Sequence, residues 1–337
     1  MASASFPILF LAPERVDDAI LGSGLVHRLL DEIPHARFTV VCSDAVAPLF
    51  RDLPVLDRTL SVEPARSFMH WLGLWRRLRG RRWGLILDLR GSSLPGFLPA
   101  RRRAVKKPAN PALEPVHKVR ELARVLKIEE EPPPAPFLYV GPETEAKAAK
   151  LLQPPRGAAE APILAMAPAA DWVGKAWPAE RFAMVAAELL GPAGPLPNGR
   201  LMLVGDNADR WATETVRRAI ARDRLIDLVG KVDVLTAFAC LRQARLFVGS
   251  DNPFQHLAAA AGAPTIGLFG PSDERVYAPW GEWGRVVRGP RSFETFKSLD
   301  PTLSQAMNHM QDLAVAKVVA AARLLLEETE PKTAVEG

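Results

Sequence analysis

Short apolar runs alternate with amphipathic helical patterns along this chain, and this alternation limits the folds that it can adopt. The runs of the first half are rich in aromatic, aliphatic or β-branched residues and are Phe6–Leu11, Phe38–Cys42 and Leu85–Leu89. After the first of these runs, apolar side chains recur at the spacing of one helical face. A strand–helix–strand order favours a parallel sheet covered by helices, since parallel strands need a crossover connection.

The same alternation starts again in the second half of the chain. Its strand-like runs are Ile163–Ala167, Arg200–Val204, Leu225–Val229, Leu246–Gly249 and Thr265–Phe269. Between the halves, EEEPPPAP and QPPRGAAEAP cannot continue a helix, although a strand at Phe137–Val140 and a helix near Glu143–Leu152 are expected between them. A last amphipathic helix is expected at Asp312–Glu328. We therefore predict two doubly wound, Rossmann-like α/β domains, residues 1–155 and 156–330.

Composition supports a division into two domains and indicates the compartment in which the chain folds. A chain of 337 residues exceeds what one core usually supports, and 48% apolar residues can fill two cores. The first residues lack a basic n-region, and the longest apolar runs are too short to span a bilayer. Cys42 and Cys240 lie in apolar runs, which is typical of buried thiols in a reducing compartment. We expect a cytoplasmic protein.

A block of basic residues runs from Arg66 to Lys107. It contains twelve lysines and arginines against one acid, Asp88, and the tryptophans Trp71, Trp75 and Trp83 are interleaved with them. Such a block indicates an anionic partner, which is a nucleic acid, a phospholipid surface or a phosphorylated glycan. The alternative is a solvated basic helix face with no partner.

The loop Gly249–His256 joins an apolar run to a helix-forming segment in the second half. The unpaired N–H groups at a helix start, together with the helix dipole, make an anion site. His256 would donate to a phosphate oxygen there, and Asp251 would cap the helix or accept a hydrogen bond from a sugar hydroxyl. The alternative is that Asp251 is an ordinary cap and His256 a structural residue.

Two further loops follow strand-like runs. Lys175, between two tryptophans, projects where a diphosphate would lie at the carboxyl end of a strand, although a lone surface lysine is usually inert. After the first strand, Asp17 and Asp18 can seat a general base or can serve as first-turn helix acids. The chain lacks GxGxxG after its first strands, GxxxxGK[ST], HExxH and cysteine pairs. These absences disfavour nicotinamide, flavin, P-loop and zinc enzymes.

Together these segments resemble glycosyltransferase family 9, the bacterial ADP-heptose:lipopolysaccharide heptosyltransferases. In the second half the matching motifs are Lys175-Ala-Trp-Pro178, Leu203-Val-Gly205, Asp227-Leu-Val-Gly-Lys231, the D-[ST]-G-x-x-H loop at Asp251–His256, and Leu268-Phe-Gly-Pro271. In the first half they are Val16–Gly24, Asp88-Leu-Arg-Gly-Ser92 and His117-Lys-Val119. The resemblance extends over nearly the whole chain.

The resemblance implies a GT-B fold, in which two Rossmann-like domains face each other across a cleft. It implies that the first domain binds the acceptor and the second binds the nucleotide sugar. Asp18 would deprotonate the acceptor hydroxyl, Lys175 would neutralise the diphosphate, and the loop Asp251–His256 would contact phosphate and sugar. The other residues expected to contact substrate are Asp17, Asp171, Asp209 and Asn252.

The resemblance also implies the chemistry and the partners. A sugar, expected to be heptose, would pass with inversion from an ADP-sugar to an acidic glycolipid of the lipopolysaccharide-core type, with no cofactor or metal required. The basic block Arg66–Lys107 would suit that acceptor, or peripheral contact with an anionic inner membrane; no nucleic-acid partner is expected.

The chain departs from the family pattern at positions that matter for this prediction. Asp17 replaces a glycine, and Asn252 and Pro253 replace a hydroxyl residue and a glycine. Proline removes one N–H from the loop, and Asp17 could share the base role or repel a phosphate. These departures leave open a catalytically inactive homologue that binds a glycan or nucleotide. A nucleotide-sugar epimerase or another Rossmann enzyme is a third alternative.

Overall fold

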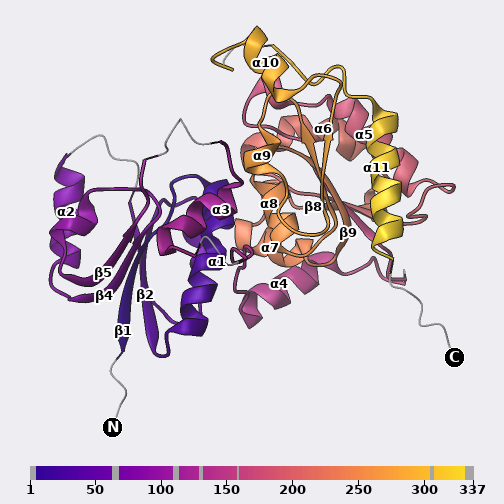
Figure 1. The fold of residues 1–337 in the computed structure, drawn as a ribbon. Helices are drawn as coiled ribbons and strands as arrows, with labels where there is room; N and C mark the ends of the chain where they lie inside the picture. Colours follow the sequence, from indigo (N-terminus) through magenta and orange to yellow (C-terminus); the bar gives the residue numbers. More distant parts are fainter. Residues whose placement is uncertain are drawn as a thin grey trace, which may run out of the picture. The chain divides into compact units, whose positions relative to one another are not determined.

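Each half of the chain folds around a parallel β-sheet of its own, as the alternation of apolar runs predicts (Figure 1). The computed structural model describes residues 5–62, 68–108, 114–128, 132–157, 159–303 and 307–330. Arg66, the first member of the predicted basic block, lies outside these residues. The halves form separate units, Met1–Gly141 and Pro142–Gly337, and each is described by itself.

The first sheet has the strand order β3-β2-β1-β4-β5. Its strands are β1 (Phe6–Leu11), β2 (Ala36–Cys42), β3 (Leu56–Ser61), β4 (Trp83–Asp88) and β5 (Ala100–Val105). The three central strands confirm the predicted ones. The apolar pattern does not predict β3 and β5, because these two edge strands are partly exposed and carry polar residues where a central strand is apolar.

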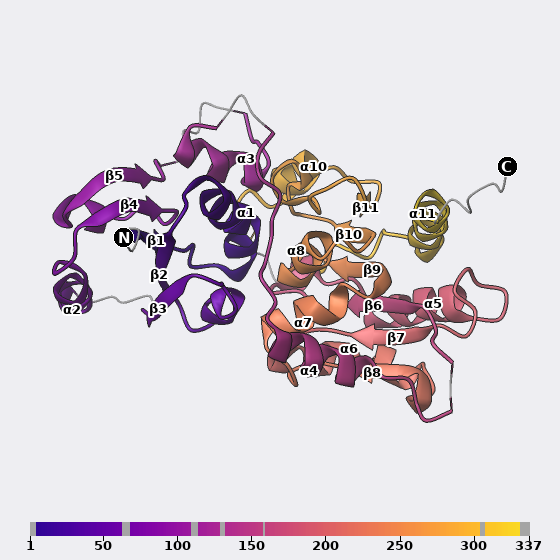
Figure 2. The same ribbon diagram turned by 90° about the horizontal axis from the view of Figure 1, so that it is seen from below.

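Helices cover both faces of this sheet (Figure 2). The helix α1 (Val16–Glu32) and the short α3 (Lys118–Ala123) lie on one face, and α2 (Phe68–Leu78) lies on the other. Under α2, leucines from the helix and from the 3-10 turn η2 (Leu94–Phe97) pack against the apolar side chains of the sheet. The other short turns of this unit are η1 (Ala47–Phe50) and η3 (Arg124–Leu126).

The predicted strand Phe137–Val140 is wrong. This segment lies along α1 instead of pairing with the sheet: the Phe137 backbone N–H donates to Ser23 Oγ at 2.9 Å, and the Phe137 ring stacks on His27. Gly24 permits this approach, since a Cβ on it would lie 2.2 Å from the Ala135 carbonyl oxygen. Aromatic side chains gave the segment a strand-like sequence, but they are satisfied by packing on a helix.

The second sheet has the strand order β11-β10-β9-β6-β7-β8. Its strands are β6 (Ile163–Ala167), β7 (Arg200–Leu203), β8 (Leu225–Asp227), β9 (Ala244–Ser250), β10 (Thr265–Phe269) and β11 (Gly284–Arg288). Five of the six match predicted runs to within a few residues. The edge strand β11 was missed, and it is the least buried of the six.

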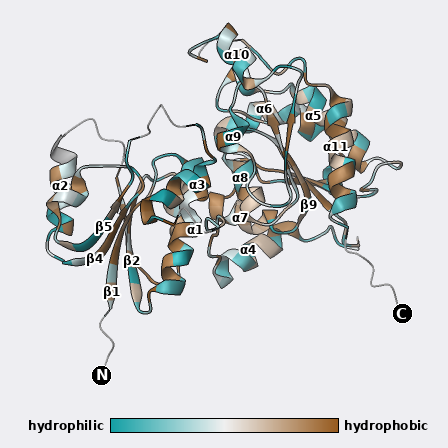
Figure 3. Ribbon diagram, viewed as in Figure 1, coloured by the Kyte–Doolittle hydropathy of each residue, from teal (hydrophilic) through white to brown (hydrophobic). Residues whose placement is uncertain are grey.

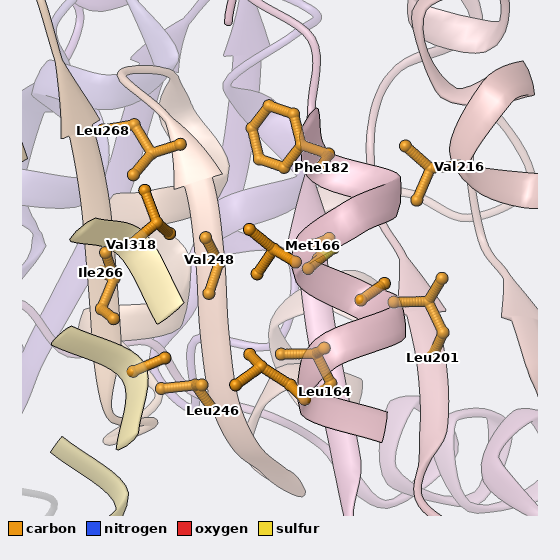
Figure 4. Close-up of a cluster of buried hydrophobic side chains, with 14 of the residues drawn as sticks. Leu164, Met166, Phe182, Leu201, Val216, Leu246, Val248, Ile266, Leu268 and Val318 are labelled. Carbon is orange, nitrogen blue, oxygen red and sulfur yellow. The ribbon is translucent and has the colours of Figure 1, made fainter. Parts of the chain in front are cut away.

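On one face of this sheet, α5 (Ala179–Leu190), α6 (Arg210–Arg218) and α11 (Val315–Glu328) enclose a large apolar core. Figure 4 shows Phe182 of α5 and Val318 of α11 among the strand side chains of that core. On the other face lie α4 (Pro142–Leu152), α7 (Val234–Leu241) and α8 (Pro253–Ala260). The shorter elements are α9 (Glu274–Tyr277), α10 (Phe293–Leu299), η4 (Val173–Lys175), η5 (Asn207–Asp209) and η6 (Arg222–Arg224).

The units divide before α4, whereas the sequence predicts a boundary after it, near residue 155. The helix α4 belongs with the second unit because it packs on α7. Two ion pairs accompany this packing: Glu145 pairs with Arg242 at 2.9 Å and Lys147 with Asp233 at 3.7 Å. The segment EEEPPPAP, which precedes α4, is thus closer to the boundary at Gly141 than QPPRGAAEAP, which follows α4.

The interior of both units is apolar, and the hydropathy colouring in Figure 3 shows brown strands beneath helices whose outer faces are teal. The two cysteines are buried as predicted, and burial raises the pKa of the Cys42 thiol to about 11 and that of Cys240 to about 12. Within the described ranges, no helix combines the length and apolar character needed to cross a membrane.

Candidate active site

The loops that follow β6, β9 and β10 meet at the carboxylate of Asp251 in the second unit. Asp251 directly follows β9 and is 6% exposed. Its Oδ2 accepts a hydrogen bond from Ser272 Oγ at 2.5 Å and lies 2.9 Å from Lys175 Nζ, while its Oδ1 accepts one from Gln255 Nε2 at 2.8 Å. Because these three strands are neighbours and parallel, their carboxyl ends share one edge of the sheet.

Lys175 lies between two carboxylates at this edge. It ends the short turn η4, and its ammonium is 3.5 Å from Asp171 Oδ1 in addition to its contact with Asp251. The lysine side chain is 21% exposed, and Asp171 is more than half exposed. Three of the residues named in the sequence analysis therefore form one cluster, in which the lysine contacts the buried Asp251 and the more exposed Asp171.

Gln255 is a member of this cluster that the sequence analysis did not name. Its side chain is fully buried, and its Nε2 donates to Asp251. Gly267 of β10 makes room for it, because a Cβ at that position would lie 2.3 Å from Gln255 Oε1. The hydrogen bond from Gln255 thus fixes the orientation of the Asp251 carboxylate, and Gly267 leaves the space that the Gln255 side chain needs.

Asn252, and not Asp251, caps α8. Its Oδ1 accepts a hydrogen bond from the Phe254 N–H at 2.9 Å, and its Nδ2 donates to the Ala169 carbonyl oxygen at 2.8 Å. Pro253 occupies the first helical position and has no N–H to offer. The Asn252 side chain therefore takes one donor of the predicted anion site at this helix start, and its amide joins the β9 loop to the β6 loop. Anion binding at the remaining N–H groups stays a prediction.

His256 lies in α8, and Asp209 lies in the loop after β7. His256 is buried within α8, and its ring faces Tyr277 at a centroid separation of 6.2 Å. Asp209 closes a capping box with Asp206 after β7, where its Oδ2 accepts from the Asp206 N–H at 2.8 Å. Burial raises the pKa of Asp209. The capping box accounts for the position of Asp209, and a substrate contact of either residue stays a prediction.

In the first unit, Asp17 and Asp18 lie in the first turn of α1, after the carboxyl end of β1. The buried Asp17 carboxylate receives the Arg15 guanidinium, with Arg15 Nη2 2.5 Å from Asp17 Oδ2, and it also accepts from the Asp18 N–H at 2.9 Å. The Arg15 side chain and the Asp18 backbone N–H therefore fix the position of the Asp17 carboxylate at the start of α1. Asp18 is partly buried and remains the candidate base.

Two lysines from other elements influence Asp18. Burial raises the pKa of Asp18, the positive charge of Lys118 lowers it, the Asp17 carboxylate raises it and Lys106 lowers it. Glu121 holds both lysines, with Lys118 Nζ at 2.6 Å and Lys106 Nζ at 3.0 Å. Lys118 belongs to the motif His117-Lys-Val119, and the sequence alone does not indicate its contact with Glu121.

Asp88 accepts hydrogen bonds from the backbone of the loop that follows β4. Its carboxylate accepts hydrogen bonds from the N–H groups of Arg90, Gly91 and Ser92, at 2.8 to 3.0 Å, and from Ser92 Oγ at 2.7 Å. Arg90 Nε in turn donates to the Ala12 carbonyl oxygen at 2.7 Å, which ties the ends of β4 and β1 together. The motif Asp88–Ser92 thus shapes the sheet edge beside α1.

A family model described as "Glycosyltransferase family 9 (heptosyltransferase)" matches residues 79–303, which is more than half of the chain. The chain belongs to glycosyltransferase family 9. It is a glycosyltransferase, in agreement with the resemblance found in its motifs.

Relatives of this family 9 enzyme extend over most of its length. Lipooligosaccharide heptosyltransferase 2 of Haemophilus influenzae is 24% identical over 311 residues, which cover 83% of this chain and 88% of the relative. A glycosyltransferase family 9 structure from Veillonella parvula matches with a TM-score of 0.80 at 17% identity, covering 98% and 99% of the two chains. The E. coli ADP-heptose LPS heptosyltransferase II matches with a TM-score of 0.75 at 20% identity, covering 97% and 100%. The fold is GT-B.

A segment that no motif indicated braces the lysine loop of this glycosyltransferase. His309 N–H donates to the Gly174 carbonyl oxygen at 3.2 Å, and Asn308 Nδ2 donates to the Ala176 carbonyl oxygen at 2.8 Å. Trp177 Nε1 donates to the Leu313 carbonyl oxygen at 3.1 Å. Segment 308–313 therefore fixes the backbone on both sides of Lys175. Its sequence carries no local signal for this role because the partners lie more than a hundred residues away.

Proposed function

We propose that this enzyme transfers heptose from ADP-heptose to an acidic glycolipid of the lipopolysaccharide-core type, with inversion at the anomeric carbon. The second unit binds the nucleotide sugar and the first unit binds the acceptor. The observation that carries the proposal is the cluster of Asp171, Lys175 and Asp251 at the carboxyl edge of the second sheet, the edge at which such sheets bind nucleotides.

The donor side of the proposal rests on Lys175. Its ammonium lies 2.9 Å from the buried Asp251 carboxylate, and its side chain is 21% exposed, which suits the approach of a diphosphate. The negative charge on the diphosphate grows as the bond to the sugar breaks, and a preorganised cation stabilises that transition state. The similar E. coli protein is an ADP-heptose LPS heptosyltransferase, which supports heptose and adenine as the sugar and base to test first.

The acceptor side rests on Asp18. Burial raises the pKa of its carboxyl, which makes the carboxylate a stronger base than an exposed aspartate, and Lys118 and Lys106 oppose that shift so that the ionised form persists. The positive charge of the two lysines suits an acceptor that bears acidic groups. Asp17 has no part in the transfer, because the Arg15 guanidinium engages its carboxylate.

The proposed step is a direct displacement. The acceptor hydroxyl oxygen attacks the anomeric carbon, and Asp18 takes the proton from that hydroxyl. The bond between the anomeric carbon and the phosphate oxygen breaks, and ADP leaves with the bonding electron pair beside Lys175. One glycosidic bond forms as one sugar–phosphate bond breaks.

A thermal-shift panel of ADP-, GDP-, UDP- and dTDP-sugars tests the donor first. We expect ADP-heptose to raise the melting temperature most. ADP release is then measured with a deacylated lipooligosaccharide core as acceptor. Stabilisation by ADP without turnover of any ADP-sugar would favour a nucleotide-binding homologue, and stabilisation by another nucleotide class alone would refute the donor.

A further inference from the structure

The loop that follows β10 is held by an arginine from the neighbouring edge strand. Arg288 ends β11 and pairs in register with Phe269, the last residue of β10. Its Nη2 donates to the carbonyl oxygen of Ser272 at 2.7 Å, and its Nη1 donates to that of Gly270. Between these two residues, Pro271 has no N–H with which to hold the loop. One guanidinium therefore contacts the backbone on both sides of the proline.

Arg288 is itself fixed by further contacts. Its side chain is 12% exposed, and Glu274 of α9 accepts from its Nε at 3.2 Å and also contacts its Nη2. Lys317 of α11 donates to the Arg288 carbonyl oxygen at 2.8 Å. A planar guanidinium can donate to two carbonyl oxygens and a carboxylate at once, which the compact ammonium of a lysine cannot do in the same geometry. The shape of this side chain, and not only its charge, therefore determines how it holds the loop.

The same loop supplies a hydroxyl group to the Asp251 cluster. Ser272 is 8% exposed, and its Oγ donates to Asp251 Oδ2, the oxygen that lies 2.9 Å from Lys175 Nζ. A serine hydroxyl is only one bond from Cβ and has few rotamers, so the backbone position of Ser272 decides whether the hydroxyl reaches the carboxylate. Because Arg288 holds the Ser272 carbonyl, loss of Arg288 would move the hydroxyl that orients Asp251.

Close packing also restricts this loop. A Cβ on Gly270 would lie 2.2 Å from Sδ of Met310, which is 1% exposed. Met310 belongs to segment 308–313, which braces the lysine loop. The loop after β10 is therefore restricted by the Arg288 guanidinium and by a buried methionine, and a close-packed interior leaves it little room for another path.

We infer that Arg288 is a positioning residue that acts on Lys175 through the hydroxyl of Ser272. The inference rests on the proposed function in one respect, which is that the donor diphosphate meets Lys175. A purely structural role would have Arg288 satisfy two carbonyl oxygens at the edge of the sheet and contribute to stability alone. The two roles differ in one consequence, since only the positioning role links a change at Arg288 to the Lys175 ammonium.

Calorimetric titration of the full chain with ADP tests this link. Arg288→Gln should raise the dissociation constant about three- to tenfold, the lower part of the range for coupling between residues in contact, and Ser272→Ala should have an effect of similar size. The double variant should bind no more weakly than the weaker of the two single variants, because both changes remove the same route to Lys175. Additive losses, or an unchanged dissociation constant in Arg288→Gln, would overturn the inference.

Arg285→Gln is the matched control on the same strand. Arg285 also donates to two carbonyl oxygens, those of Glu282 at 2.7 Å and Gly284 at 3.0 Å, and it pairs with Glu328 at 2.6 Å. It lies near the amino end of β11, so its loss should lower the melting temperature without weakening ADP binding. An equal loss of ADP affinity in this control would contradict a specific role of Arg288.

Arg288→Lys separates geometry from charge. This variant keeps the positive charge but cannot bridge both carbonyl oxygens of the loop and the Glu274 carboxylate. It should recover only part of the ADP affinity that Arg288→Gln loses. Full recovery would assign the effect to charge alone and would overturn the positioning role.

A second readout needs no donor, so a failure of the proposed function remains distinguishable. Competitive labelling with acetic anhydride, followed by mass spectrometry, compares the amine of Lys175 with that of the exposed Lys150 on α4. A carboxylate beside an ammonium favours the charged, unreactive form. Arg288→Gln and Ser272→Ala should therefore speed the labelling of Lys175 relative to Lys150, and an unchanged ratio would overturn the inference. A changed ratio in a chain that does not bind ADP would refute the donor site and support the positioning role.

Discussion

Lys175 and Asp251 approach to 2.9 Å although they belong to loops after different strands, and the second oxygen of Asp251 is held by Gln255. Asp251 is 6% exposed and is engaged by Lys175, Gln255 and Ser272, so its main role in this structure is to orient the lysine. The three contacts leave acceptor capacity on the carboxylate, so the contact of Asp251 with a sugar hydroxyl stays a prediction. We expect the donor phosphates to meet Lys175, which carries the positive charge of the cluster.

Replacement of Lys175 by alanine should weaken ADP binding by about 1.5–3 kcal/mol, the range for a hydrogen bond to a charged group. Isothermal titration calorimetry measures this change. Lys150→Ala on the exposed face of α4 removes the same charge away from the cluster and should leave the affinity unchanged. Equal dissociation constants for the wild type and Lys175→Ala would remove the lysine from the donor site.

Replacement of Asn252 by alanine should destabilise the second unit by about 1–2 kcal/mol, because α8 loses its cap and the amide bridge to Ala169 is broken. Urea unfolding followed by circular dichroism measures the change. Ser292→Ala removes the more exposed cap of α10 and serves as the comparison, with a smaller expected loss. A loss no greater than that of Ser292→Ala would contradict the bridging role.

Replacement of Asp18 by asparagine should lower turnover by about 10²–10⁴-fold, the contribution of a general base, with ADP affinity unchanged. Burial raises the pKa of Asp18 above its ordinary 3.8, so the ionised carboxylate is less stable in the folded chain than in the unfolded chain. The Asp18→Asn variant should therefore match or exceed the wild-type melting temperature at neutral pH. This difference should vanish as the pH falls below the ordinary range of aspartate. Parallel losses of turnover and stability would instead indicate a structural acid.

Replacement of Lys118 by methionine should move the acidic limb of the kcat/KM profile to higher pH. The Lys118 charge lowers the pKa of Asp18, so without it the carboxyl stays protonated over a wider range. Lys107→Met removes an exposed neighbouring charge and should move the limb less. The midpoint of the limb is independent of the amount of folded enzyme, and an unmoved midpoint would show that Lys118 does not act on the base.

Lys175 and Asp251, which the sequence places after two strands, meet because of one physical regularity. Loops after neighbouring parallel strands share an edge, so polar residues placed directly after strand-like runs can be expected to meet. The same reasoning did not decide which side chain caps α8, because it counted N–H groups without assigning an acceptor to each of them. Aspartate and asparagine both cap helices well, and only the backbone path shows that Asn252 does so here.

Other parts of the site had no signal in the sequence. Gln255 is one residue before a named histidine, but only its burial and the absence of a Cβ at Gly267 direct it toward Asp251. Segment 308–313 braces the lysine loop through backbone carbonyl oxygens, which any sequence supplies. The edge strands β3, β5 and β11 were missed because a half-exposed strand does not require an apolar run.

The sequence by itself determined the two parallel-sheet units, the family and the loops that carry the Lys175 and Asp251 cluster. It could do so because burial on both faces forces parallel strands to be apolar, and because the motifs keep a fixed order along the chain. Tertiary structure decided how those side chains are used. A carboxylate or an amide takes its role from the donors and acceptors that reach it. For Asp251, Asn252 and Asp18 those partners come from segments that folding brings together: the lysine loop, the Ala169 carbonyl and the Lys118 helix.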